Sequence, residues 1–302
     1  MDVVTRPVRD SLARMILTKV AGPDPQSERD RVHATPGPRW FAEDRPIRRL
    51  HGDASMFAGG LRALLLQSLH PLAMAAVAAH SGYRGDPWGR LRRTSYFLAI
   101  TTYGAIPDAE EAIAHVRSVH ERVRGTSPDG VKYRASDPHL LKWVHIAEVD
   151  SFLAAHQRYG AHPLNAEEQD QYVEDAALVA EKLGVIDPPT TLAEVRRLLT
   201  EYQAELRGTT EARQAARFIL IHPPVPWAAR PAYGVLTAAA VGLLPWWTRL
   251  PLRLPYLPLA EQTVVRAAGE GLTRTIRWAL ASPTLASPTL ASPTLASTGA
   301  EG

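Results

Sequence analysis

The segment from Phe57 to His80 constrains the fold most, because it is apolar on every side of any helix it forms. Such a helix is not amphipathic and is expected to be buried. Pro71 lies inside the segment, and a proline removes a backbone donor and clashes with the preceding turn. The sequence therefore predicts a buried central helix that is broken or kinked at Pro71.

Capping residues divide the rest of the chain into further helices. Three aspartates are expected to cap the starts of helices, because their carboxylates can accept backbone N–H groups there. Two of them precede a proline, which favours the first helical position. The three aspartates are Asp86, Asp108 and Asp137. Glycines expected just after helix ends are Gly104, Gly125 and Gly160. Helical periodicity continues over residues 166–183, 192–206, 211–220 and 261–280, and no segment alternates as a strand would. The predicted class is all-α, with one multi-helix globular domain.

Three regions are expected along the chain. Residues 1–54 form an N-terminal helix followed, over 24–54, by a proline-, glycine- and charge-rich arm with little regular structure. Residues 55–281 form the helical domain. Residues 282–302 contain the unit SPTLA three times, and a proline at every fifth position forbids a helix, so this tail is expected to be disordered and dispensable for activity.

The chain has no cysteine, which excludes disulfides, iron–sulfur clusters and thiolate-bound haem. Any metal must therefore be held by histidine or carboxylate. The 34 Lys and Arg against 31 Asp and Glu give a net charge of +3, which is too small to predict nucleic-acid binding without a clustered patch. The N-terminus lacks the features of a signal peptide, so a cytoplasmic location is expected.

The apolar stretch at residues 231–247 is shorter than a membrane span of roughly 20 residues and contains prolines and glycines. Tryptophans and arginines surround it over residues 222–255. Two interpretations remain open. The segment is either a core helix between proline-rich loops or a peripheral contact with a lipid surface.

His120 is the most unusual of the eleven histidines, because it lies in the middle of an apolar stripe formed by Ile113, Val116 and Val123. A core imidazole needs a partner for its ring nitrogens. It is either a hydrogen-bonded structural histidine or a metal ligand. His115 lies about 140° around the same helix, so these two histidines cannot chelate one ion.

Two arginines, Arg117 and Arg124, are placed one turn either side of His120. They can pair with carboxylate groups of a cofactor, or they are ordinary surface residues. His145 and Glu148 are one turn apart on an apolar helix, which suggests a di-iron bundle. However, such bundles use Glu-x-x-His twice, whereas this chain shows His-x-x-Glu once, so the pattern argues against that site.

In the helix after Asp86, four residues share a narrow face: Arg90, Thr94, Phe97 and Thr101, with Arg93 beside them. A face of this composition is either the wall of a cavity that orients a polar diatomic molecule next to an apolar substrate, or a surface arginine cluster that packs its stems.

Residues 67–97, 101–125 and 141–152 resemble the haem oxygenase family of rubber oxygenase (latex clearing protein) and the fungal oxygenase of mycophenolic acid biosynthesis. The resemblance extends over about residues 40–280. It implies an all-α domain with a pocket for haem b. The family's proximal histidine, which precedes a Val-Arg pair, matches His120, and its distal residues match Arg90, Arg93 and Thr94.

The chain departs from the family in two places. Arg93 replaces a lysine of rubber oxygenase, and guanidinium is a poor metal ligand because it stays protonated. The family's distal glutamate has no match in the apolar run that precedes His80, although His70 and His80 flank this run as substitute acids or bases. The resemblance implies a haem-dependent oxygenase that delivers dioxygen to a carbon–carbon double bond of an apolar, isoprenoid-like substrate. The alternatives are a haem-binding sensor without turnover and a helical membrane-surface protein. No motif identifies an electron donor.

Overall fold

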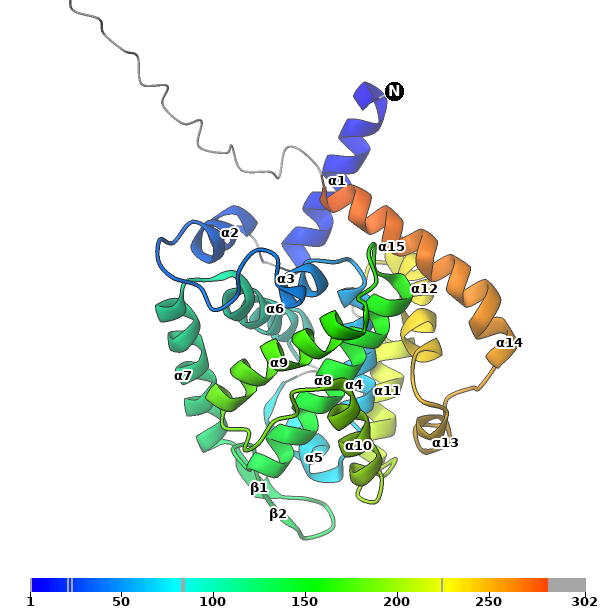
Figure 1. The fold of residues 1–302 in the computed structure, drawn as a ribbon. Coiled ribbons are helices and arrows are strands. Elements are labelled where there is room, and N and C mark those ends of the chain that lie inside the picture. The colour runs from blue at the N-terminus through cyan, green and yellow to red at the C-terminus, as the bar shows by residue number, and fades with distance from the viewer. Residues whose placement is uncertain (1, 21, 23, 83–84, 224, 282–302) are drawn as a thin grey trace, which may run out of the picture.

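The computed structural model describes residues 2–20, 22, 24–82, 85–223 and 225–281, and within them the chain is almost entirely helical (Figure 1). This confirms the predicted all-α class. The SPTLA repeats lie outside the described residues.

The elements have the following bounds: α1 Asp2–Val20, α2 Pro25–His33, α3 Pro46–His51, α4 Met56–Gln67, α5 Pro71–His80, α6 Pro87–Tyr103, α7 Ile106–Arg122, β1 Arg124–Thr126, β2 Lys132–Arg134, α8 Pro138–Tyr159, α9 Ala166–Leu183, α10 Leu192–Tyr202, α11 Thr210–Ile221, η1 Trp227–Ala229, α12 Arg230–Gly242, η2 Trp246–Thr248, α13 Arg249–Leu252, α14 Pro258–Ala260, η3 Glu261–Val265 and α15 Arg266–Leu280.

The apolar segment around Pro71 forms two helices, α4 and α5, whose axes make an angle of 109°. The break predicted at Pro71 is therefore confirmed. No single helix in the described ranges is long and apolar enough to cross a membrane. The bent α4–α5 pair is long and apolar enough only when its two helices are taken together.

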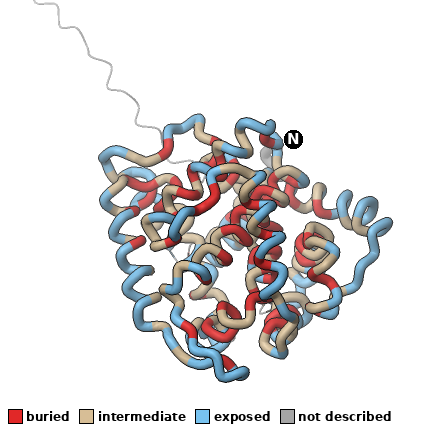
Figure 2. The backbone as a smooth tube through the Cα atoms, turned by 60° about the horizontal axis from the view of Figure 1, so that its bottom comes forward, coloured by how far each residue is buried: buried red, intermediate tan, exposed pale blue. Residues whose placement is uncertain are grey.

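Helix α8 is the centre of the domain, and α4 packs along it (Figure 1). The close approach requires Gly59, because a Cβ atom there would lie 3.1 Å from Cδ1 of Phe152. Gly60, by contrast, faces open space. Most of the largest fully buried side chains belong to α3, α4, α8 and α9, and they include Leu65, Trp143 and Ile146. Figure 2 shows these buried stretches inside a rim of exposed residues.

Two predicted helix starts are confirmed and one is wrong. Asp86 and Asp137 cap α6 and α8, each accepting a backbone N–H. Asp108 lies inside the first turn of α7, because Pro107 sets the start of that helix two residues earlier. Similarly, α7 ends at Arg122, so Gly125 lies beyond the helix end.

Residues after α7 form a short hairpin instead, with β1 and β2 antiparallel around the turn Ser127–Gly130. Three-residue strands are too short to show the period of two that identifies a strand in sequence.

The expectation of an arm without regular structure over residues 24–54 is wrong in part, because α2 and α3 lie within it. Both helices have proline at their first turn, and Asp24 accepts a hydrogen bond from the backbone of Ser27 at 3.2 Å. These prolines, expected to interrupt helices, occupy the position where their fixed φ starts one.

Candidate functional site

The position of His120 agrees with the sequence pattern. It lies in the last turn of α7. Earlier on the same helix, Ile113 is buried and Val116 is half-buried. The Nδ1 atom of His120 is buried and has no hydrogen-bond partner among the described residues. Burial lowers the pKa of this imidazole, and the charge of Glu121 offsets part of that effect. The neutral form, which has a free lone pair on one ring nitrogen, is therefore favoured. His115 is exposed, as its angle around the helix predicts.

The arginines predicted beside His120 are both exposed. Arg117 donates from Nη1 to the carbonyl of Lys182 at 3.3 Å, and Arg124 lies in β1 opposite Arg134. Within the described chain, neither forms an ion pair with a carboxylate of the protein. Their guanidinium groups therefore remain available to an anionic group at this end of the molecule.

The face predicted on α6 runs from solvent to core. Thr94 is exposed, Phe97 is half-buried, and Thr101 is buried with its hydroxyl donating to the carbonyl of Phe97 at 2.7 Å. Arg90 is half-buried and donates from Nη1 to the hydroxyl of Ser81 at 3.0 Å. Arg93 is exposed and lies 3.4 Å from a carboxylate oxygen of Asp86.

Arg90 and His120 lie on neighbouring helices. Gly104 and Ala105 alone separate α6 from α7, and the two helices pack against each other. Arg90 lies near the start of α6, and His120 lies near the end of α7.

Helix α8 carries two deep titratable side chains, which the sequence marks only as a di-iron pattern. Burial lowers the pKa of His145 to about 4 and raises that of Glu148 to about 7. Both nevertheless keep an intermediate accessible surface. The Nε2 atom of His145 has no partner in the described chain.

A second deep histidine, His51, lies in a polar chain. The Nδ1 atom of His51 is 2.8 Å from the hydroxyl of Thr102, and its Nε2 atom is 3.5 Å from the hydroxyl of Tyr172. Burial lowers the pKa of His51 to about 3. Burial also raises the pKa of Tyr172, and the charge of Glu148 acts in the same direction.

Sequence reasoning missed His51 and Tyr172, because neither lies in a motif and their partners come from distant helices. The i, i+3 spacing on an apolar helix did mark His145 and Glu148. No third histidine or carboxylate of the described chain joins this pair closely enough to form a three-ligand metal group. The chemistry available here is a neutral imidazole and a carboxyl that exchanges a proton near neutral pH inside an apolar core.

Comparison with known proteins identifies a family. The family model described as ER-bound oxygenase mpaB/B'/Rubber oxygenase, catalytic domain, matches residues 48–278. Two curated relatives, the uncharacterized proteins Mb2261 of Mycobacterium bovis and Rv2237 of Mycobacterium tuberculosis, are each 32% identical over 111 residues. That alignment covers 35% of this chain and 43% of each relative, less than half of their length. No solved structure matches the chain.

Proposed function

We propose that this chain, which belongs to the family of the ER-bound oxygenase mpaB/B' and rubber oxygenase catalytic domain, is a haem b-dependent oxygenase. It uses dioxygen and an apolar, unsaturated substrate of isoprenoid type. Family membership supports an oxygenase role. The observation that supports haem binding is the Nδ1 atom of His120, which is buried and has no hydrogen-bond partner among the described residues, on an imidazole that burial keeps neutral.

His120 is the residue that would hold the iron, because neutral imidazole is the ligand form and the chain offers no cysteine. Arg117 and Arg124, on either side of it and free of protein carboxylates among the described residues, would pair with the haem carboxylates. When bound, the haem supplies dioxygen binding and the redox chemistry.

The remaining residues provide polarity and a proton. Arg90, Arg93 and Thr94 lie on α6, which packs against the helix of His120, and their donors would orient dioxygen and the developing oxyanion. Glu148 replaces the distal acid that the sequence lacks near His80. Because burial raises its pKa to about 7, this carboxyl can hold a proton and release it near neutral pH.

The test is haem retention in His120→Ala, measured by the absorption spectrum and a pyridine haemochrome assay on protein expressed with haem supply. We expect the wild type to carry near-stoichiometric haem and the variant to lose it, while most of the helicity remains. His115→Ala, an exposed histidine on the same helix, is the matched control. Wild-type haem content in His120→Ala contradicts the assignment.

A second set of variants distinguishes the role of the proposed distal residues from that of the iron ligand His120. Arg93→Ala and Thr94→Ala are expected to keep haem and to slow substrate-dependent oxygen uptake, because both side chains are exposed and support no core packing. Haem retention without oxygen uptake from any apolar alkene in wild-type protein would instead support a haem-binding protein without turnover.

A second candidate function, peripheral lipid binding through residues 222–255, is favoured by the exposed apolar side chains of this region. Trp246 is 72% exposed, and Leu250 is 87% exposed. Tryptophan is enriched at membrane interfaces, and Arg253 in the same segment attracts anionic headgroups. We therefore propose contact with an anionic lipid surface without a span.

Co-sedimentation with vesicles of anionic phospholipid tests this contact. Leu250→Glu is expected to release the protein from the vesicles, because it places a carboxylate at the lipid boundary. Ile186→Glu, also at an exposed apolar position but elsewhere, is the control. Equal binding by both variants would refute lipid contact through this region.

A further inference from the structure

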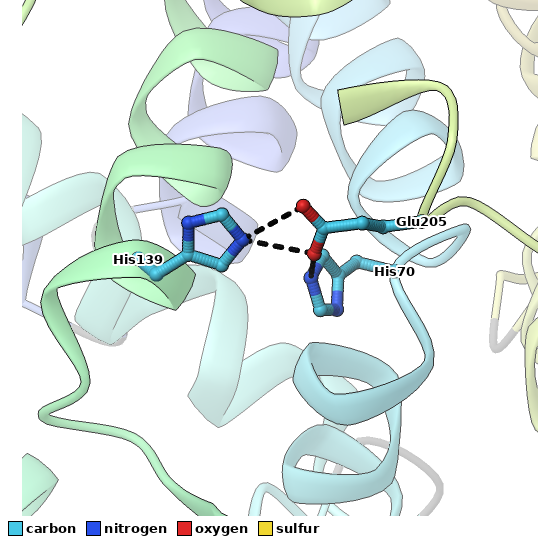
Figure 3. Close-up of side chains that lie close together, drawn as sticks. All are labelled: His70, His139 and Glu205. Atoms are coloured by element: carbon cyan, nitrogen blue, oxygen red, sulfur yellow. Dashed lines mark hydrogen bonds and ion pairs between the residues drawn. The ribbon is translucent and has the colours of Figure 1, made fainter. Parts of the chain in front are cut away.

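Three metal-ligating side chains from distant parts of the chain converge at one point (Figure 3). His70 precedes α5 at the bend after α4, His139 lies in the first turn of α8, and Glu205 comes after α10. One atom of each lies within 4.8 Å of the others. The Nε2 atom of His139 is 2.8 and 3.0 Å from the two carboxylate oxygens of Glu205, and that of His70 is 3.3 Å from one of them.

Tyr202 favours the tautomer of His139 that carries its proton on Nδ1. Its hydroxyl donates to the carbonyl of His139 at 2.8 Å, so its only proton is used. The same oxygen lies 3.2 Å from Nδ1 of His139 and can therefore only accept, which places the ring proton on Nδ1. The Nε2 lone pair then faces the carboxylate of Glu205. Two lone pairs at 2.8 Å repel, so this geometry requires a cation between them.

His70 distinguishes a metal ion from a proton as that cation. Its side chain is 3% exposed, and neither ring nitrogen has a hydrogen-bond partner within the described residues. Its polar contact, Nε2 to Glu205 at 3.3 Å, lies outside hydrogen-bond geometry, and a buried imidazole in that state is costly. A proton shared by His139 and Glu205 would leave this contact as it is, whereas a metal ion accepts a lone pair from all three groups at once.

We infer that His70, His139 and Glu205 bind a divalent transition-metal ion of the Zn²⁺ type. Two imidazoles and one carboxylate suit zinc and its neighbours, whereas Mg²⁺ and Ca²⁺ prefer oxygen ligands alone. Side chains of His139 and Glu205 are 52% and 44% exposed, so a fourth position is open to water.

The spacing of the three groups is compatible with this ion. Metal–ligand bonds of about 2.0–2.2 Å at tetrahedral angles place ligand atoms about 3.4 Å apart. The 3.3 Å between His70 and Glu205 fits this separation. The 2.8 Å to His139 requires an outward shift of about half an ångström, which the half-exposed Glu205 can make. The ring of Tyr202 stacks on His139 with centroids 4.6 Å apart and holds its orientation.

A metal ion here would tie the loop after α10 to the starts of α5 and α8. This loop already meets the bend through the backbone N–H of Arg207, which donates to the carbonyl of Leu69 at 2.8 Å. We therefore expect zinc to raise the thermal midpoint as well as to bind, because a ligand that binds only the folded chain stabilises it.

The experiment uses the tag-free full chain, dialysed against a chelator and then titrated with Zn²⁺ by calorimetry, with bound zinc counted by elemental analysis. We expect one zinc per chain. His139→Ala and Glu205→Gln remove one ligand each and are expected to weaken binding at least about 100-fold. Tyr202→Phe, which loses the hydroxyl contacts with Nδ1 and with the carbonyl of His139, is expected to weaken zinc binding about 10–100-fold.

Matched controls are His115→Ala and Glu201→Gln, both exposed and outside the cluster, which should bind zinc as the wild type does. Zinc X-ray absorption should show imidazole nitrogens and oxygen at about 2.0–2.1 Å. Two results overturn the inference: no zinc retained by the wild type, or equal affinity in His139→Ala and Glu205→Gln and the wild type. These measurements are independent of haem content, so they stand apart from the oxygenase proposal.

Discussion

Glu148→Gln should stabilise the protein relative to the wild type, by an amount that grows as the pH rises. The carboxyl lies deep on α8, where burial raises its pKa from the ordinary 4.5 to about 7. A neutral amide of the same shape does not titrate. The difference between the two proteins therefore isolates the cost of ionising one buried carboxyl, while His145 and the rest of the fold are common to both.

The size of the effect is set by the pKa values. Below pH 4.5 the carboxyl is protonated in both the folded and the unfolded chain, so it has no influence on the pH dependence of stability. Between pH 4.5 and about 7 the unfolded chain releases the proton and the folded chain keeps it, so the free energy of unfolding falls by about 1.4 kcal/mol per pH unit. Above about pH 7 the full cost is reached, about 3 kcal/mol.

Denaturant unfolding measured by circular dichroism, at pH values from about 5 to 8, gives this difference. The free energy of unfolding of Glu148→Gln should exceed that of the wild type by an amount that grows across this range. Glu167→Gln, at an exposed position in the first turn of α9, is the control and should give a constant difference. A difference for Glu148→Gln that does not change with pH would refute a buried, protonated carboxyl.

Three further predictions concern packing and the tail. Arg62→Met should destabilise the fold by about 3–5 kcal/mol, because the buried guanidinium lies 2.6 Å from Asp150 and its loss leaves that carboxylate unpaired; adding Asp150→Leu should recover part of this in denaturant unfolding. Gly59→Leu should cost at least about 1–3 kcal/mol through overpacking against Phe152, whereas Gly60→Leu should be tolerated, as thermal melts can show. Removal of residues 282–302 should leave oxygen uptake unchanged, and a loss of uptake would contradict a dispensable tail.

Local signals predicted the helices well because they act within a few residues. Pro71 breaks the apolar segment, and Asp86 and Asp137 cap the helices that begin after them. The errors have the same local origin. Pro107 sets a helix start ahead of Asp108, and the prolines at the starts of α2 and α3 initiate helices where they were expected to prevent them. Whether a proline starts or breaks a helix depends on the residues on either side of it.

The candidate site was predictable only where one helix carries its signal. The stripe around His120 is visible from periodicity, since all its members lie on or next to α7. In contrast, His51, Thr102 and Tyr172 come from three helices, and their contact depends on how α3, α6 and α9 pack. A single sequence contains no local pattern that predicts how these helices pack against one another.

The two metal-binding proposals differ in the same way. The assignment of His120 depends on a pattern within one helix and on family membership, so both the sequence and the structure support it. The sequence suggests His70 only as a substitute acid or base, because its partners lie 69 and 135 positions further along the chain. Three-dimensional packing brings these groups within 4.8 Å and leaves a buried imidazole that makes no hydrogen bond within the described residues, although Glu205 lies 3.3 Å away. The missing hydrogen bond, more than the proximity, is the reason to look for an ion there, because exposed histidine–carboxylate pairs are satisfied by water and this imidazole is not.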